Sequence, residues 1–312
     1  MRIQNPREVY GRTLVEIGRE NPNIVVLEAD LGKSTMSCYF EQAFPERFFE
    51  MGIAEANMTS FAAGLSLTGK IPFTNSFAVF AAGRSYDQIR QGICIAGLNV
   101  RIVGSSCGLS DFGDGSTHQS VEDIAIMRAI PNIAVLVPAD GNETRTMTRA
   151  LADFKGPAYM RITRNDLPDV MPTDEPFVLG KPHLIREGNH VVAFANGQMV
   201  SMAVAAAEKL ADAGISLRVV NVSSMKPVDK VSLAALADGM KGVVTLEEHS
   251  TVGGLASLMS EILHGRTTPM RSIGIDDRFG QSAHSYEDLL QAYGLTQEHI
   301  ADAVRQLAKP KT

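Results

Sequence analysis

The chain has 312 residues, of which 45% are hydrophobic and 21% charged, and its formal net charge at pH 7 is −6. This length favours two domains, and an acidic chain without a basic cluster argues against nucleic acid as a partner. No apolar stretch is long enough to cross a membrane, and the first residues lack the apolar core of a signal peptide. Three cysteines cannot all pair, which is typical of reduced thiols, so we expect a cytoplasmic protein.

Apolar runs alternate with amphipathic segments along the first half of the chain. Helical spacing is found at 7–19 and 142–154, and short apolar runs at 24–27, 100–104, 133–137 and 158–162. This alternation predicts parallel strands connected by helices. Because the runs are apolar throughout rather than at every second residue, helices should cover both faces of the sheet.

The alternation breaks between residues 165 and 188, where four prolines and several acidic residues gather, as in a linker. It resumes with apolar runs at 190–195, 217–222, 242–246 and 270–275 and a helical segment at 198–213. We therefore predict an α/β protein of two domains, each a mostly parallel sheet flanked by helices. The domains should span residues 1–167 and 188–312, with a linker at 168–187.

Glu55 opens a segment of small and apolar residues that we expect to be helical as far as Leu67. A carboxylate in the first turn is favoured by the helix dipole, so Glu55 is explained by capping alone. Few charges surround it in the sequence, however, and a buried carboxyl would keep its proton and share it with a ligand nitrogen. Phe77 and Phe80 share one face of a helix or turn, either as core or as the wall of a slot for a flat ring.

Residues 104–119 form a loop rich in glycine and serine, placed directly after the apolar run at 100–104. Ligands of open α/β sheets bind at the carboxyl ends of strands, so this loop is either a binding loop or a plain surface connection. It carries Asp114 and His118, and a histidine acts as an acid, base or hydroxyl donor near neutral pH.

Several cations are candidates for an anion site. Arg7, Arg161 and Arg164, with Ser34, offer donors suited to phosphate oxygens, although each arginine alone equally forms a surface ion pair. In the second half, Glu247-Glu248-His249 precedes Gly253-Gly254, a pattern that fits a nucleotide loop or tight strand–helix packing. We assign no catalysis to it.

Read together, these segments resemble transketolase over nearly the whole chain and in that family's order. The resemblance is carried by four motifs, at residues 52–58, 76–80, 86–90 and 113–119. It is shared in part with deoxyxylulose phosphate synthase and the β subunits of 2-oxoacid dehydrogenases. It implies a pyrimidine-binding domain up to about residue 165 and a transketolase C-terminal domain from about residue 185.

The resemblance also implies an activity: a two-carbon ketol unit moves from a ketose, as a phosphate or similar acidic sugar, to an aldose. Thiamine diphosphate and Mg²⁺ are the implied cofactors. Glu55 would hydrogen-bond N1′ of the aminopyrimidine, and Glu55 and His118 would be the catalytic residues. The other implied contacts are Phe77, Phe80 and Asp30 to the cofactor, Asp114 and His118 to sugar hydroxyls, and Arg7, Ser34 and Arg164 to the phosphate end.

Three positions depart from the family pattern. Ser106, which we expect to contact the substrate, stands where many transketolases have a histidine that helps hold the charged end of the substrate. Asp111 and Phe112 replace residues that are usually small or apolar. A sugar with a different acidic end, or a modified sugar, is therefore an alternative to the standard pentose phosphates.

The resemblance begins after the diphosphate-binding domain of a full-length transketolase. Gly113-Asp114-Gly115 imitates part of a magnesium–diphosphate motif, but Glu143 follows Asn142 where that motif needs a second asparagine, so we predict no metal site in this chain. We expect an N-terminal subunit to hold Mg²⁺ and the diphosphate, in a heterotetramer built on self-associated dimers of this chain. The alternatives are a deoxyxylulose-phosphate-synthase-like or 2-oxoacid dehydrogenase activity, and a non-catalytic assembly or regulatory subunit.

Overall fold

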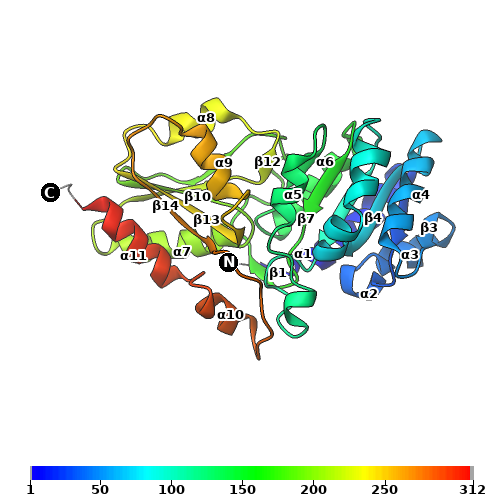
Figure 1. Ribbon diagram of the computed structural model, residues 1–312, viewed down its shortest axis with the longest axis horizontal. Helices are drawn as coiled ribbons and strands as arrows, with labels where there is room; N and C mark the ends of the chain where they lie inside the picture. Colours follow the sequence, from blue (N-terminus) through cyan, green and yellow to red (C-terminus); the bar gives the residue numbers. More distant parts are fainter. Residues whose placement is uncertain (1, 310–312) are drawn as a thin grey trace.

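The computed structural model describes residues 2–309, which form two parallel-stranded sheets side by side with helices on both faces of each (Figure 1). The first sheet has the order β12-β6-β7-β5-β4-β2-β3, and the second has the order β14-β13-β10-β11-β9. Strands of the first sheet are β2 (Ile24–Glu28), β3 (Phe48–Glu50), β4 (Ile71–Phe77), β5 (Arg101–Ser105), β6 (Ala134–Leu136), β7 (Ala158–Arg161) and β12 (Ser224–Lys226). Those of the second are β9 (His183–Arg186), β10 (Val191–Ala195), β11 (Leu217–Asn221), β13 (Gly242–Ser250) and β14 (Met270–Ile275).

The predicted α/β class with two mostly parallel sheets is confirmed. Only the outer strands β12 and β9 run antiparallel to their neighbours among the strands of these two sheets within residues 2–309. The longer helices are α1 (Pro6–Glu20), α4 (Glu55–Leu67), α5 (Asp123–Ala129), α6 (Gly141–Asp153), α7 (Met199–Ala211), α8 (Lys230–Leu236), α9 (Leu255–Ile262), α10 (Tyr286–Ala292) and α11 (Gln297–Ala308). Shorter pieces are α2 (Gly32–Thr35), α3 (Cys38–Ala43), η1 (Pro45–Arg47), η2 (Val79–Arg84), η3 (Gln88–Cys94) and η4 (Gly115–Thr117), and a two-stranded sheet joins β1 (Ile3–Gln4) to β8 (Leu167–Pro168).

Strand β2 shows why the strands are apolar throughout. Ile24 and Val26 pack with α1 and α6 on one face, while Val25 and Leu27 pack with α4 and α5 on the other. Successive side chains of a strand point to opposite faces, so burial of both faces favours apolar residues at successive positions. The second sheet repeats the arrangement, with α7 and α11 on one face and α8 and α9 on the other.

The segment predicted as a linker, residues 168–187, contains more structure than its composition indicates. Its last part forms β9, an edge strand that pairs antiparallel with β11, and its beginning completes β8. Proline is tolerated at sheet edges because no neighbour needs its missing N–H, which is how a proline-rich segment forms strands.

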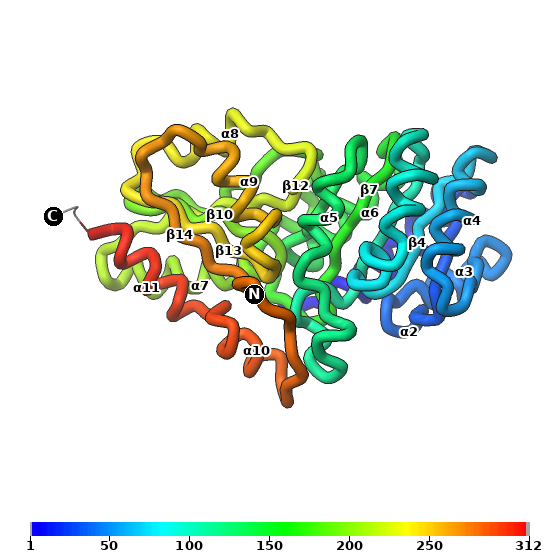
Figure 2. The backbone as a smooth tube through the Cα atoms, viewed as in Figure 1, coloured from blue at the N-terminus to red at the C-terminus, as the bar shows by residue number. Residues whose placement is uncertain are grey.

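The two halves are connected by more than this segment. Strand β12 lies after β11 in sequence, yet it pairs with β6 and completes the first sheet. Figure 2 shows the chain crossing back at this point between the two sheets. Helices α5 and α9 also share one hydrophobic cluster that contains residues of both sheets. The carboxyl-end loops of the first sheet are therefore held against the second domain.

Candidate active site

Glu55 is the first residue of α4, and its side chain is 4% exposed. Its carboxylate Oε1 accepts a hydrogen bond from Arg84 Nη1 at 2.9 Å, and the Arg84 side chain is 51% exposed. Few charges lie near Glu55 in the sequence, but the fold brings Arg84 to it from η2. A buried carboxylate with a half-exposed partner can exchange that partner for another donor.

Phe77 and Phe80 lie next to this ion pair, at the end of β4 and in η2. Their ring centroids are 6.1 Å apart and their planes differ by 18°. The imidazole of His118 meets both rings edge-on, with centroids at 6.2 Å from Phe77 and 5.3 Å from Phe80. The guanidinium carbon of Arg84 lies 4.1 Å from the Phe80 centroid, a cation–π distance. Contacts thus connect Glu55, Arg84, Phe80, Phe77 and His118 into one group, which we call the Glu55 cluster.

Sequence reasoning missed Arg84. A usable signal was present, because residues 77, 80 and 84 are spaced as neighbours on one helical face. Strand β4 was missed as well, because Pro72 and the polar residues Thr74, Asn75 and Ser76 are not typical of a buried strand. All seven residues of β4 are buried, and Asn75 satisfies its amide with the carbonyls of Leu27 and Phe73, both at 3.1 Å.

The loop 104–119 leaves the carboxyl end of β5, as predicted. Ser106 is fully buried in the left-handed region at φ 51°, and its Oγ has no hydrogen-bond partner. A non-glycine residue in this region stores strain, which is often found at functional sites. Further along, Asp114 is exposed, and His118 shares a 2.9 Å hydrogen bond between its Nδ1 and Thr117 Oγ1.

Residues of the second domain contact the loop 104–119. Glu248 Oε1 accepts hydrogen bonds from the Leu109 N–H at 2.7 Å and the Tyr286 hydroxyl at 2.9 Å. Gly108 has φ +61°, and a Cβ there would lie 2.4 Å from the Glu248 carboxyl carbon, so only glycine lets the carboxylate approach. Burial raises the pKa of Glu248 to about 7, against the opposing field of Arg161. The loop that carries Asp114 and His118 is thus fixed by residues of the other domain.

A second group gathers Arg7, Ser34 and Arg164, three of the residues predicted at the phosphate end. Arg7 Nη1 donates to the Ser34 carbonyl at 2.7 Å, and Arg164 Nη1 pairs with Asp111 Oδ2 at 2.7 Å. Arg7 and Arg164 line one cavity, and the charge of Arg164 adds to the effect of burial in lowering the pKa of Arg7. We call these residues with Asp111 the arginine group.

Arg161 does not belong to the arginine group, although the sequence offers it as an anion-site candidate. Its side chain is 2% exposed, and its Nε donates to Asp123 Oδ2 at 2.9 Å. Its Nη2 donates to the carbonyls of Ser120 at 3.2 Å and Glu248 at 2.9 Å. Arg161 therefore connects strand β7, helix α5 and strand β13 inside the protein, and it is not available to a ligand.

Asp30 is exposed in a left-handed conformation two residues after the end of β2, and its N–H donates to Glu50 Oε1 at 2.9 Å. Its neighbour Glu28 is buried, and its Oε2 accepts from the hydroxyls of Thr35 and Ser37. Burial raises the pKa of Glu28 to about 7, while these hydrogen bonds lower it. Glu28 thus anchors the turn that displays Asp30 and Ser34. Asp30 and Asp114 are both exposed, outside the two groups.

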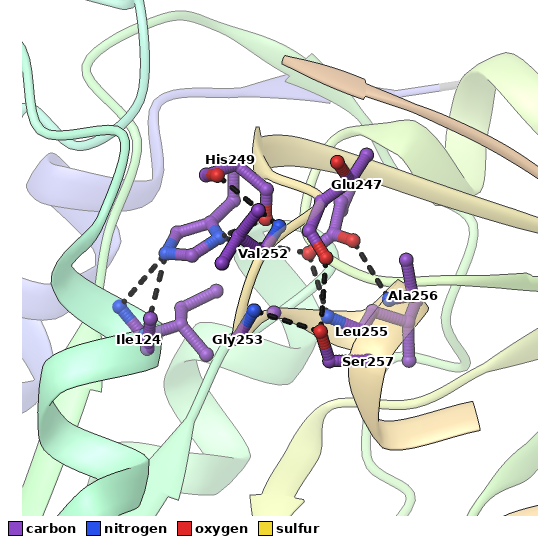
Figure 3. A network of polar contacts seen from close by, with 12 residues as sticks. Ile124, Glu247, His249, Val252, Gly253, Leu255, Ala256 and Ser257 are labelled. Atoms are coloured by element: carbon purple, nitrogen blue, oxygen red, sulfur yellow. Dashed lines mark hydrogen bonds and ion pairs between the residues drawn. The ribbon is translucent and has the colours of Figure 1, made fainter. Parts of the chain in front are cut away.

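The glycine-rich turn before α9 is closed to nucleotides. Figure 3 shows the Glu247 carboxylate at the start of α9, where it accepts from the N–H groups of Leu255 at 2.6 Å and Ala256 at 2.8 Å. His249 Nε2 meanwhile accepts from the Ile124 N–H at 3.2 Å. Burial lowers the pKa of His249 to about 4, in keeping with a neutral acceptor ring. Tight packing between domains explains this motif.

Residues 2–309 contain no group of three or more His, Cys, Asp or Glu side chains placed to hold a metal ion. Over the same range, no helix combines the length and the apolar character that crossing a bilayer requires.

The sequence matches two family models over most of its length. One describes the pyrimidine-binding domain of transketolase and matches residues 4–170, and the other describes the transketolase C-terminal domain and matches residues 180–300. The chain thus combines a pyrimidine-binding domain and a C-terminal domain of the transketolase type. It belongs to the transketolase family.

Individual relatives give the same result. A Methanocaldococcus jannaschii protein named "Putative transketolase C-terminal section" is 41% identical over 307 residues, which cover 97% of this chain and 96% of that one. The 6-deoxy-6-sulfo-D-fructose transketolase subunit SqwH of a Clostridium species is 39% identical, over 98% of this chain and 95% of that protein. A solved structure, "Split gene transketolase, inactive beta4 tetramer", has 44% identity and a TM-score of 0.88, covering 97% of this chain and 98% of that one.

Proposed function

We propose that this chain is the C-terminal subunit of a two-subunit, thiamine-diphosphate-dependent transketolase that moves a two-carbon ketol unit from a ketose to an aldose. The observation that carries the proposal is the Glu55 cluster. A carboxylate with 4% exposure stands beside two nearly parallel phenyl rings and a histidine. Family membership alone does not require these side chains to meet, whereas binding the aminopyrimidine of thiamine does.

The residues present fit the pyrimidine end of the cofactor. Glu55 supplies a carboxyl group that can share a proton with a ring nitrogen, and Phe77 with Phe80 supplies a flat apolar wall. The present partner of Glu55, Arg84, is half exposed and can move into solvent when a ring takes its place. When bound, thiamine diphosphate supplies the electron sink for breaking and forming carbon–carbon bonds.

The chain's own residues then act on protons. Glu55 shares a proton with N1′ of the pyrimidine, so the ring is held in the tautomer that the chemistry needs. His118 lies against the same aromatic wall and exchanges a proton with a hydroxyl or carbonyl oxygen of the sugar. Asp114 accepts a hydrogen bond from a further hydroxyl, and the arginine group holds the far end of the substrate.

We further propose that Mg²⁺ and the cofactor diphosphate are held mainly by a separate N-terminal subunit. The support comes from relatives of the same length, one named a C-terminal section and another a subunit. By analogy with the split-gene tetramer described as inactive, the isolated chain self-associates and lacks turnover on its own. Its surroundings in the cell would be the cytoplasm.

The test is reconstitution with hydroxypyruvate as donor and glyceraldehyde as acceptor, in the presence of thiamine diphosphate and Mg²⁺. We expect ketose formation by the mixture of this chain with an N-terminal transketolase section, and none by either chain alone. In the mixture, Glu55→Gln should lower kcat at least 100-fold, within the usual range for a proton-transfer residue. Glu46→Gln, a change at a largely exposed carboxylate (69%), is the matched control.

Two results would count against this proposal. Full turnover by the isolated chain would remove the need for a second subunit. Unchanged turnover in the Glu55→Gln complex would mean that this chain contributes to assembly of the enzyme and not to its chemistry. A deoxyxylulose-phosphate-synthase-like activity is the second candidate, because such an enzyme from Caldanaerobacter subterraneus is 35% identical over 97% of this chain and 49% of that protein. Condensation of pyruvate with glyceraldehyde 3-phosphate distinguishes it, and oxidative decarboxylation of a 2-oxoacid distinguishes the dehydrogenase alternative.

A further inference from the structure

The loop 104–119 is closed near its base by a pair of backbone hydrogen bonds. The Gly108 N–H donates to the Ser120 carbonyl at 2.9 Å, and the Ser120 N–H donates to the Gly108 carbonyl at 3.2 Å. Between these two residues the only helical piece is the single turn η4. A compact loop of this kind keeps its shape through side chains that fill its interior. Gln119 is such a side chain, with 4% exposure.

The side-chain amide of Gln119 connects points that are far apart along the chain. Its Nε2 donates to the carbonyls of Leu109 at 3.3 Å and Asp111 at 3.1 Å, both in the first half of the loop. It also donates to the carbonyl of Gln281 at 3.1 Å, in the second domain. Gln281 belongs to residues 276–284, an irregular stretch between β14 and α10 that we call the 276–284 segment. One amide thus joins both halves of the loop to the second domain.

The 276–284 segment packs directly on the loop. A Cβ at Gly280 would lie 1.7 Å from Gln119 Oε1, so the absence of a side chain at Gly280 leaves the room that the amide occupies. The Ala283 N–H donates to the Phe112 carbonyl at 2.9 Å, which adds a second connection. The segment and the loop therefore form one packed unit, with the Gln119 amide between them.

His118 lies in this unit, directly before Gln119. The N–H groups of His118 and Gln119 both donate to the Gly115 carbonyl, at 2.9 and 3.0 Å, so the two residues share one tight turn. The imidazole of His118 meets the Phe80 ring with centroids 5.3 Å apart. Because the turn is short, the position of the Gln119 amide determines where the backbone of His118 lies.

The geometry points to Gln119 as a positioning residue, which holds His118 at the aromatic wall by connecting the loop to the second domain. This inference rests on the proposed function, in which His118 exchanges a proton with the sugar. Proton transfer needs its two heavy atoms within hydrogen-bond reach, and a displacement of about 1 Å costs up to about 100-fold in rate. The second domain contributes no residue to the Glu55 cluster, yet it supports catalysis through the 276–284 segment.

Hydrogen exchange of the chain by itself tests the connection without turnover. Gln119→Leu removes both N–H donors and keeps an apolar side chain of similar size inside the loop. Backbone amides of residues 108–120 should then exchange roughly tenfold faster than in the wild type, while those of β2 keep their rates. Gln291→Leu, the same change at an exposed glutamine of α10, is the control and should alter neither. Equal rates in the wild type and Gln119→Leu overturn the inference.

A double-mutant cycle in the reconstituted complex tests whether Gln119 acts through His118. With hydroxypyruvate and glyceraldehyde, Gln119→Leu should lower kcat/KM roughly 10- to 100-fold and leave the Kd of thiamine diphosphate unchanged. In a complex that already carries His118→Ala, the same substitution should cost less than about twofold, since the residue to be positioned is gone. Equal losses in the two backgrounds, or weaker cofactor binding, contradict the positioning role.

Gly280→Ala reaches the same amide from the second domain and replaces Gln119→Leu if that variant does not fold. The new methyl group meets the end of a side chain rather than backbone, so it displaces the Gln119 amide at little cost to folding. Turnover should fall roughly tenfold. In a Gln119→Ala complex, whose shorter side chain leaves room, Gly280→Ala should cause no further loss. A further loss of the same size there overturns the inference.

Failure of the proposed function has a different signature. A wild-type complex that forms no ketose overturns the catalytic role of Gln119 together with the proposed function. The exchange rates of residues 108–120 still report the connection to the second domain, because they need no turnover.

Discussion

Two arginine–carboxylate pairs in this protein have the same 2.9 Å separation and opposite surroundings. In the Arg84–Glu55 pair the arginine is 51% exposed, whereas in the Arg161–Asp123 pair neither side chain is more than 2% exposed. Arg161 is also bonded to two carbonyls, and Asp123 accepts from the Tyr159 hydroxyl at 2.8 Å. Distance alone therefore says little about role. The number of additional partners and the access of water separate a replaceable pair from a permanent one.

Removing one member of the permanent pair should have the largest effect on stability. Asp123→Ala leaves the Arg161 guanidinium buried without its counter-charge, and breaking such pairs costs about 3–5 kcal/mol. Denaturant unfolding of the variant should show a loss of this size. The matched control is Asp302→Ala, which removes the carboxylate from an exposed pair with Arg305 and should change stability little. Equal effects of the two substitutions would contradict the distinction drawn above.

A smaller effect is expected from Glu248, which adjoins the permanent pair. Its pKa in the folded protein is raised to about 7 from the ordinary 4.5, chiefly by burial. The folded state therefore holds the proton more tightly than the unfolded state, so this group stabilises the protein below pH 4.5 and the contribution is lost as pH rises to 7. Since one pKa unit corresponds to about 1.4 kcal/mol, Glu248→Gln should reduce the decline of stability between these pH values by up to roughly 3 kcal/mol.

Unfolding free energies measured at several pH values provide the test for Glu248. Buried Glu28, Glu143 and Glu247 also have pKa values raised to about 7, so a residual decline will remain in the variant. A decline as steep as in the wild type would mean that Glu248 does not take up a proton in this range.

The smallest expected effect concerns the replaceable pair. Arg84→Ala frees the Glu55 carboxylate and removes the guanidinium from the Phe80 ring. Because water screens the half-exposed Arg84 guanidinium, the pair should compete with the cofactor only weakly, and thiamine diphosphate should bind the reconstituted complex up to about fivefold more tightly. Titration followed by calorimetry measures this change, and Arg12→Ala, from an exposed pair with Glu8, is the control. Weaker binding in Arg84→Ala would show that Arg84 holds the cofactor and does not compete with it.

The sequence predicted the parts of the fold whose local pattern agrees with their environment. Residues 24–27 are apolar because both faces of β2 are covered, and the helix beginning at Gly141 has its capping Asp140, which accepts from the Glu143 N–H at 2.9 Å. The strands that were missed have sequences that do not match the buried, paired positions that they occupy. In β4, Pro72 and Asn75 are accommodated only by contacts made after folding, and the short β12 pairs with a strand far away in sequence.

The candidate site likewise has a part that the sequence predicted and a part that it did not. Glu55, Phe77, Phe80 and His118 were selected by their motifs, and the structure places all four in one cluster. The motifs did not include the ion-pair partners of the charged residues. Arg84 on Glu55 and Asp111 on Arg164 are contacts between segments 29 and 53 residues apart, and no periodicity encodes them.

Strand β12 has a consequence for exchanging domains between members of this family. Residues 224–226 follow the second domain's β11, but they close the edge of the first sheet at β6. A chimera joined at the proline-rich segment would therefore pair one parent's β6 with the other parent's strand, and a fragment ending there would leave β6 with open N–H and C=O groups. Such open edges recruit strands from other molecules. A hybrid that is to remain soluble needs β12 and β6 from the same parent.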